Sequence, residues 1–305
     1  MSIKVLHILF LFSISISVGF GQSLLSQYMA EVDGRVIKAL PANFMEEAVN
    51  QVAVYDELKI YARGDDINKR ASAMALALKI GRQSSNPILR RTAVDFIIDE
   101  IIFEKDRGQK GAYINYLKRF KQTDFTTESK QKLLPLINKK TNNLKTLVLI
   151  IGFLEMEEAK EIMIALDGIP KSVKEARQLA LIRMGDQSQL SQFVSAVKKL
   201  KVNDDFNYRT LPSLNYTREK AIFDYLLEIL QSDNNNCHPA DAETEGNIPC
   251  GIRIMEALAN SIENFPLEVD EYGELITNNY KKAFETAKRW AKKNANKYTL
   301  DKNKF

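Results

Sequence analysis

The sequence predicts an all-α protein in which short amphipathic helices pack as antiparallel pairs. Strand signals are almost absent, since no segment sustains an alternation of apolar and polar residues and no Asn-Gly hairpin dipeptide occurs. Apolar stripes with spacings of three and four residues recur along the chain instead. Two stripes, at 148–166 and 179–197, match at a constant offset of 31 residues, and a fixed period of this kind indicates a repeated unit.

The first 21 residues are typical of a secretory signal peptide. Lys4 supplies the positive end, Val5 begins an apolar core that runs to Val18, and Gly19-Phe20-Gly21 is a small-x-small cleavage site. The alternative is an uncleaved membrane anchor, but the run is short for a span of about 20 residues. We therefore expect a single mature domain, 22–305, that is exported to the periplasm or outside the cell. The Gly-Gln junction is typical of exported bacterial proteins.

The net charge is too small to indicate nucleic-acid binding. It is +4 for the whole chain, and Lys4 is the only charged residue in 1–21, so the mature chain carries +3.

Helical stripes follow one another through the first half of the mature chain. One comes after Pro41, a second runs from Arg70 to Gly81, and Asn86-Pro87 provides a cap and a first-turn proline for a third. The third is apolar on more than one side, which a helix needs when it packs between two neighbours. The stripes contain Phe44, Ala48, Val52 and Tyr55, then 70–81, then Leu89, Ala93, Val94, Phe96, Ile97, Ile98, Ile101 and Ile102.

The segment 173–200, VKEARQLALIRMGDQSQLSQFVSAVKKL, predicts two short helices joined at Gly185-Asp186. Gly185 can adopt the left-handed conformation that ends the first helix. Asp186 can cap the second helix, with Gln189 able to bond back. Each helix carries its apolar residues on one side.

This unit resembles a HEAT repeat, of the armadillo-type α-solenoid class. KRASAMALALKIG, at 69–81, resembles the first helix of such a repeat, and NPILRRTAV, at 86–94, resembles the start of another. The resemblance implies a right-handed α-solenoid of antiparallel helix pairs with irregular repeats. It also implies scaffold or adaptor work, in which the protein binds another protein.

Two long segments without a clear helical stripe are predicted to be loops. The first, Lys201 to Tyr216, contains Phe206 and Tyr208, the first choices for aromatic anchors that contact a partner. The alternative is that these aromatic residues pack back over the helices. The second, Gln231 to Pro249, is rich in Asn, Asp and Glu.

The only two cysteines belong to this region: Cys237 lies within the second loop, and Cys250 follows it directly. In an oxidising compartment we expect them to form one disulfide, and two free buried thiols are the alternative. Asp241, Glu243 and Glu245 alternate as in a calcium loop, but Ile252 stands where the bidentate glutamate is needed. An acidic surface loop is the better interpretation, and we expect no metal site.

The chain ends in a basic amphipathic helix, expected at about 270–300. Residues 281–305 carry nine basic and two acidic side chains, a charge of +7. The apolar side closes the last hydrophobic face as a cap, and the basic side can bind an anionic membrane surface or polymer. We expect Trp290, Lys292 and Lys293 to contact the partner or the anionic surface.

Residues suited to catalysis are sparse. His238 is the only histidine of the mature chain, and neither Gly-x-Ser-x-Gly nor a Gly-rich phosphate loop occurs. We expect no catalytic residues and no cofactor, and hence a non-enzymatic protein-binding scaffold. The alternatives are an envelope-associated structural protein held by the basic helix, and a hydrolase or lyase that uses a pair of carboxylates.

Overall fold

The regular elements of the chain are helices. The computed structural model describes residues 23–32, 43–48, 51–233, 235–239, 246–270, 273–295 and 297–305. Within these ranges no β-strand forms, and only three isolated β-bridges occur. The prediction of an all-helical chain is confirmed for this part, whereas the expected signal peptide, 1–21, lies outside it. No helix within the described ranges is long and apolar enough to cross a membrane.

Fifteen α-helices are present in the described ranges, together with short 3-10 turns and one π-helical turn, η5. The α-helices are α1 (Leu24–Glu31), α2 (Phe44–Ala48), α3 (Val54–Ala62), α4 (Ile67–Gln83), α5 (Pro87–Phe103), α6 (Arg107–Tyr116), α7 (Thr127–Leu133), α8 (Leu144–Phe153), α9 (Lys160–Ile164), α10 (Lys171–Arg183), α11 (Gln187–Val197), α12 (Leu211–Thr217), α13 (Lys220–Gln231), α14 (Gly251–Ala259) and α15 (Tyr280–Asn294). The short turns are η1 (Leu117–Arg119), η2 (Gln122–Asp124), η3 (Leu134–Leu136), η4 (Glu157–Ala159) and η5 (Phe206–Thr210).

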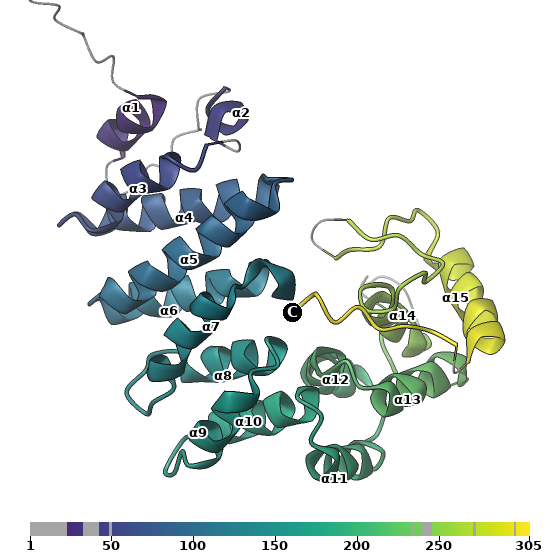
Figure 1. Ribbon diagram of the computed structural model, residues 1–305. Coiled ribbons are helices and arrows are strands. Elements are labelled where there is room, and N and C mark those ends of the chain that lie inside the picture. The colour runs from purple at the N-terminus through teal and green to yellow at the C-terminus, as the bar shows by residue number, and fades with distance from the viewer. Residues whose placement is uncertain are drawn as a thin grey trace, which may run out of the picture.

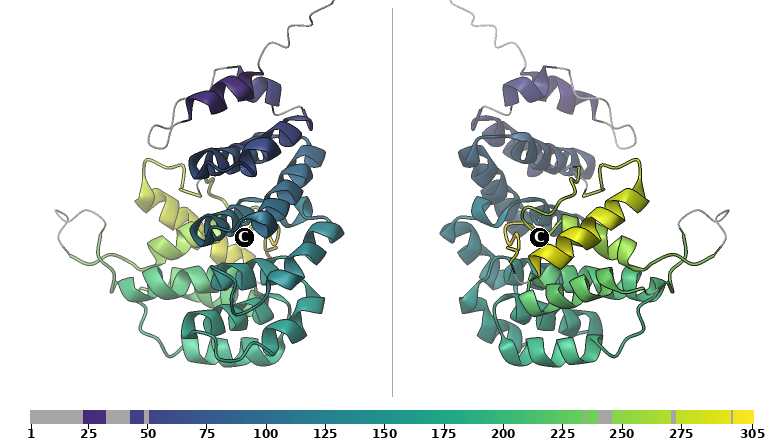
Figure 2. Two further views of the ribbon diagram at one scale, coloured as in Figure 1. Left: turned by 90° about the vertical axis from the view of Figure 1, so that its left-hand side faces the viewer. Right: turned by 90° about the vertical axis from the view of Figure 1, so that its right-hand side faces the viewer.

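Helices that are close in sequence pack together. Helix α3 packs on α4, α4 on α5, α8 on α10 and α10 on α12, and α13, α14 and α15 form a group of their own. Figure 1 shows the first ten helices as a stack, after which the chain turns at α11 and α12 and places α13–α15 beside it. The side views in Figure 2 show the same succession.

The core consists of two hydrophobic layers that meet at α10. The first layer extends from Leu25 to Met184 and includes Tyr216, and the second extends from Ile182 to Ala291. Phe193, on α11, packs against both. Helix α10 therefore supplies buried side chains to both layers.

The two stripes that match at an offset of 31 residues occupy corresponding helices. The first falls on α8 and η4–α9, and the second on α10 and α11. Gly185 has a φ of +88° and ends the first helix of the second pair. The side chain of Asp186 accepts a hydrogen bond from the Gln189 backbone N at 3.0 Å, so the predicted cap forms. The Gln189 side chain pairs with Gln178 instead of bonding back.

Two arginines occupy equivalent positions near the starts of α4 and α5. Arg70 and Arg90 each donate from Nη1 to two carbonyl groups of the turn that precedes their helix. Each also donates from Nε to a buried carboxylate 34 residues further on. The distance from Arg70 to Glu104 is 3.0 Å, and that from Arg90 to Asp124 is 2.8 Å. In both places the arginine therefore connects its own helix to the turn before it and to a carboxylate that lies after the following helix.

Three predicted boundaries differ from the structure. The stripe after Pro41 is two helices, α2 and α3, because Val52 lies in the connection between them and is half exposed. The basic helix is shorter than expected: α15 starts at Tyr280, where the Asn279 side chain caps it, and ends at Asn294.

The third difference concerns Lys201 to Tyr216, which is largely helical and not a loop. It forms the π-helical turn η5 and then α12, which has Pro212 in its first turn. The Asn203 side chain accepts a hydrogen bond from the backbone N of Phe206 at 3.0 Å and so supports the start of η5. Leu211 and Leu214, three residues apart, are buried in the second layer, which explains the helical conformation.

Candidate functional site

The structure separates the two aromatic candidates of this segment. The side chain of Phe206 is 2% exposed and belongs to the second hydrophobic layer, whereas Tyr208 is 71% exposed. Phe206 is therefore a core residue and we no longer regard it as a partner contact. Tyr208 remains available to a partner.

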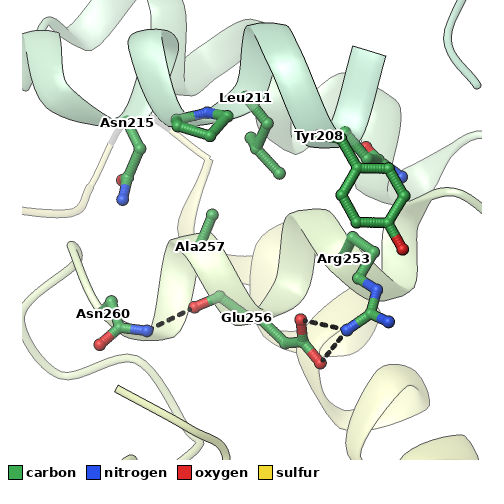
Figure 3. Close-up of a pocket in the computed structure, with 9 residues that line it drawn as sticks. Tyr208, Leu211, Asn215, Arg253, Glu256, Ala257 and Asn260 are labelled. Atoms are coloured by element: carbon green, nitrogen blue, oxygen red, sulfur yellow. Dashed lines mark hydrogen bonds and ion pairs between the residues drawn. The ribbon is translucent and has the colours of Figure 1, made fainter. Parts of the chain in front are cut away.

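Tyr208 stands at the edge of a groove between η5–α12 and α14, which we call the Tyr208 groove. Figure 3 shows the side chains that face one another across it. The groove encloses about 380 Å³. It is lined by Asn207, Tyr208, Leu211, Pro212, Asn215, Arg253, Glu256, Ala257 and Asn260.

The α14 side of the groove is a row of polar side chains held by hydrogen bonds. Arg253 Nη1 lies 3.1 Å from Glu256 Oε2, and both side chains are partly exposed. Asn260 Nδ2 donates to the Glu256 carbonyl at 3.1 Å and to the Gly273 carbonyl at 2.7 Å. These bonds fix the side chains before a ligand arrives, which lowers the entropy cost of binding.

Arg253 is a stable cation beside two tyrosines. Burial alone would lower the pKa of Arg253, but the hydrogen bond and the negative charge of Glu256 outweigh it, and the pKa is raised. The phenols of Tyr208 and Tyr280 lie close enough to raise it further. Tyr280, the first residue of α15, is 44% exposed. The groove thus presents one exposed aromatic ring, that of Tyr208, and a guanidinium, the residue types enriched at the energetic centres of protein interfaces.

The Cys237–Cys250 pair and its neighbour His238 contact the segment that carries Tyr208. The sulfurs of Cys237 and Cys250 lie 2.06 Å apart, at disulfide-bonding distance. Asn207, the neighbour of Tyr208, donates from Nδ2 to the Cys237 sulfur at 3.2 Å. His238 Nδ1 lies 2.6 Å from Asp204 Oδ2, and this hydrogen bond lowers the pKa of Asp204. Cys237 and His238 therefore hold the residues that immediately precede Tyr208.

The predicted contacts on the basic helix lie on different sides of α15. Trp290 is partly buried and packs edge-on against Phe265, with ring centroids 4.9 Å apart. Lys292 and Lys293 are exposed in the last turn. Trp290 thus contributes to the attachment of α15 to the second layer, where Ala283, Phe284, Ala287 and Ala291 are buried.

Asp241, Glu243 and Glu245 lie outside the described residues. Among the residues that are described, no group of three or more His, Cys, Asp or Glu side chains is arranged to hold a metal ion.

The sequence pattern did not single out Arg253, Glu256 or Asn260. A signal was nevertheless present, because spacings of three and four residues place them on one polar side of α14 and its C-terminal cap. What the sequence lacks is any indication that this side faces Tyr208 and not open solvent.

Comparison of the chain with models of protein families, with curated proteins and with solved structures finds no match. The HEAT resemblance therefore depends on the sequence segments quoted above.

Proposed function

We propose that this protein is an exported, non-enzymatic scaffold or adaptor that binds another protein through the Tyr208 groove. The segments α8–α9 and α10–α11 support an α-solenoid of HEAT-like repeats, because four of the six apolar positions that match at an offset of 31 are buried in both segments, although Ile162 is exposed. The observation that carries the functional proposal is the cluster of the exposed Tyr208 and the Arg253–Glu256 pair around one groove.

The cluster is suited to protein recognition for a physical reason. Tyrosine offers a large contact area with only two side-chain torsions, so its immobilisation costs little entropy. Arg253 is already held by Glu256, and η5 is fastened by Asn203 and by the contact of Asn207 with Cys237. A partner would thus meet a surface that needs little rearrangement.

Replacing Tyr208 with alanine is expected to weaken capture of the partner at least about tenfold, because aromatic anchors dominate interface energies. The melting temperature should stay unchanged, since the Tyr208 side chain is exposed. The measurement is a quantitative pull-down from the native envelope and medium at low and high salt, read by mass spectrometry.

Ile60→Ala is the matched control, because Ile60 on α3 is 70% exposed, as Tyr208 is, and lies outside the groove. Proteins that are retained at high salt by the native chain and the control, but lost from the tyrosine variant, would support the proposal. Equal capture by all three chains would refute it.

A second candidate function is attachment to an anionic membrane surface or polymer through α15. The observation that favours it is a group of exposed cations on that helix, while its alanine-rich side is buried. The exposed cations are Lys281, Lys282, Arg289, Lys292 and Lys293.

Reversing two of these charges, in Lys292→Glu with Lys293→Glu, is expected to weaken binding to phosphatidylglycerol vesicles about thirtyfold. The reason is that each lysine near an anionic membrane contributes roughly 1 kcal/mol to the binding free energy. Raised salt should abolish the binding of the unchanged chain. The control is the same reversal at Lys171 and Lys174, two exposed lysines on α10. Equal weakening by both reversals would show that overall charge, and not α15, directs the binding.

A further inference from the structure

The segment Leu300–Phe305, which we call the return segment, runs back from α15 to the middle of the stack. Figure 1 shows it passing α14 and reaching the side of α7. Asp301 N donates to the Ser261 carbonyl at 2.8 Å, and Gln122 N donates to the Asn303 carbonyl at 3.2 Å. The segment thus contacts the end of α14 on one side and η2 on the other.

Two buried arginines bind the main chain of the return segment. Arg183, 1% exposed, donates from Nη2 to the carbonyls of Lys302 and Lys304 at 3.0 and 2.8 Å. Arg218, 2% exposed, donates from Nε to the Asp301 carbonyl at 3.0 Å. Burial lowers the pKa of both guanidiniums. A buried cation requires polar partners, so these carbonyls, together with the Tyr216 carbonyl and the Asn215 side chain, offset part of the desolvation cost of the two guanidiniums.

The ring of Phe305 fills the aromatic end of the same site. Its centroid lies 5.6 Å from that of Phe153 and 5.5 Å from that of Tyr216. Lys118 Nζ lies 4.8 Å from the centre of the Phe305 ring, in a cation–π contact. The guanidinium of Arg183 contacts the Phe153 and Tyr216 rings as well. We call the site formed by Arg183, Arg218, Phe153, Tyr216 and Lys118 the Arg183 cleft.

The cleft recognises little of the sequence that it holds. The side chains of Lys302, Asn303 and Lys304 are exposed, and the nearest carboxylate oxygen to Lys302 Nζ, on Glu155, lies 3.7 Å away. The contacts are made to main-chain carbonyls, to one aromatic ring and to the negative charge of Asp301, which acts to raise the pKa of both arginines. An extended segment with an acidic residue four positions before an aromatic residue could make the same contacts.

We propose that the Arg183 cleft is a peptide-binding site, which the chain's own return segment occupies in the present structure. Its ligand class is an extended segment of a partner protein that presents carbonyl groups to the two arginines and an aromatic ring to Phe153 and Tyr216. Such a partner binds by displacing the return segment. This site shares no residue with the lining of the Tyr208 groove, although Arg218 donates to Asn215 of that lining at 2.8 Å. The proposal does not depend on the function proposed for that groove.

The test uses a fluorescent peptide of residues 298–305 and the full chain with Phe305→Ala. The internal segment competes at a high effective concentration, so the unchanged chain should bind the peptide weakly. Phe305→Ala loosens the internal competitor and should bind the peptide at least about tenfold more tightly. A matched peptide with alanine in place of phenylalanine should bind to neither chain. Equal binding of the two peptides, or no binding to the variant, would overturn the proposal.

A second measurement needs no variant. The peptide is made with a photo-reactive benzoylphenylalanine at its last position and cross-linked in excess to the unchanged chain. Cross-links mapped to α8, α12 or η1, the elements that carry Phe153, Tyr216 and Lys118, support exchange at the cleft. Cross-links only to other elements, or none at all, would contradict it.

Discussion

Replacing Gly152 with alanine is expected to lower the free energy of unfolding by about 3 kcal/mol, the upper range for overpacking a core. Gly152 lies in α8 where that helix meets α10. A Cβ atom there would stand 2.5 Å from Ala180 Cα and 2.5 Å from Tyr216 Oη. Neither neighbour can withdraw easily, since one is helix backbone and the other donates to the Leu149 carbonyl at 2.6 Å. Urea denaturation followed by circular dichroism measures the loss.

Gly111→Ala is the matched control. Gly111 also lies in a helix, α6, but a Cβ atom there would meet only Asn143 Cβ, at an ordinary 3.7 Å. Alanine should raise the free energy of unfolding by about 0.5–1 kcal/mol at this position, because glycine weakens a helix interior. If both substitutions changed the free energy of unfolding by the same amount, the result would contradict the close contact of α8 with α10 at Gly152.

Replacing Arg90 with methionine is expected to lower the free energy of unfolding by about 3–5 kcal/mol. The change removes the cation from Asp124, which is 2% exposed, and a buried carboxylate without its partner is strongly unfavourable. It also removes the two bonds to the carbonyls before α5. Denaturation of both single variants and of Arg90→Met with Asp124→Asn gives the coupling energy in a double-mutant cycle.

The control for this cycle is the ion pair between Lys132 and Asp99. Its N···O distance of 2.9 Å is nearly the same as that of the Arg90 pair, but the side chains are 28% and 40% exposed. Lys132→Met should therefore cost at most about 1 kcal/mol. A loss as large as that of Arg90→Met would show that burial does not decide the strength of these pairs.

The sequence predicted those helix boundaries that depend on local chemistry. Asn86 caps α5 in front of Pro87, and Gly185 and Asp186 separate α10 from α11, as expected. These signals act within one turn of helix, so nearby residues suffice to reveal them. The break between α2 and α3 was missed because the stripe keeps its spacing across it.

The candidate site could be predicted only in part, because side-chain direction depends on secondary structure. Treated as loop residues, Phe206 and Tyr208 were equivalent candidates. In a helical turn, residues two apart point to nearly opposite sides, so one enters the core while the other meets solvent. Arg253 and Glu256 face Tyr208 from a different helix, α14, and no local pattern encodes that meeting.

The return segment has a consequence for the order in which the protein folds. Most helix packing joins neighbours in sequence, which favours rapid formation of the stack. The bonds from Arg183 to Lys302 and Lys304 close loops of 119 and 121 residues, so they carry a larger entropic cost of closure. During synthesis the helices that form the Arg183 cleft leave the ribosome before the segment that fills it. The cleft is thus completed while it is empty, and its own segment docks as a late event in folding.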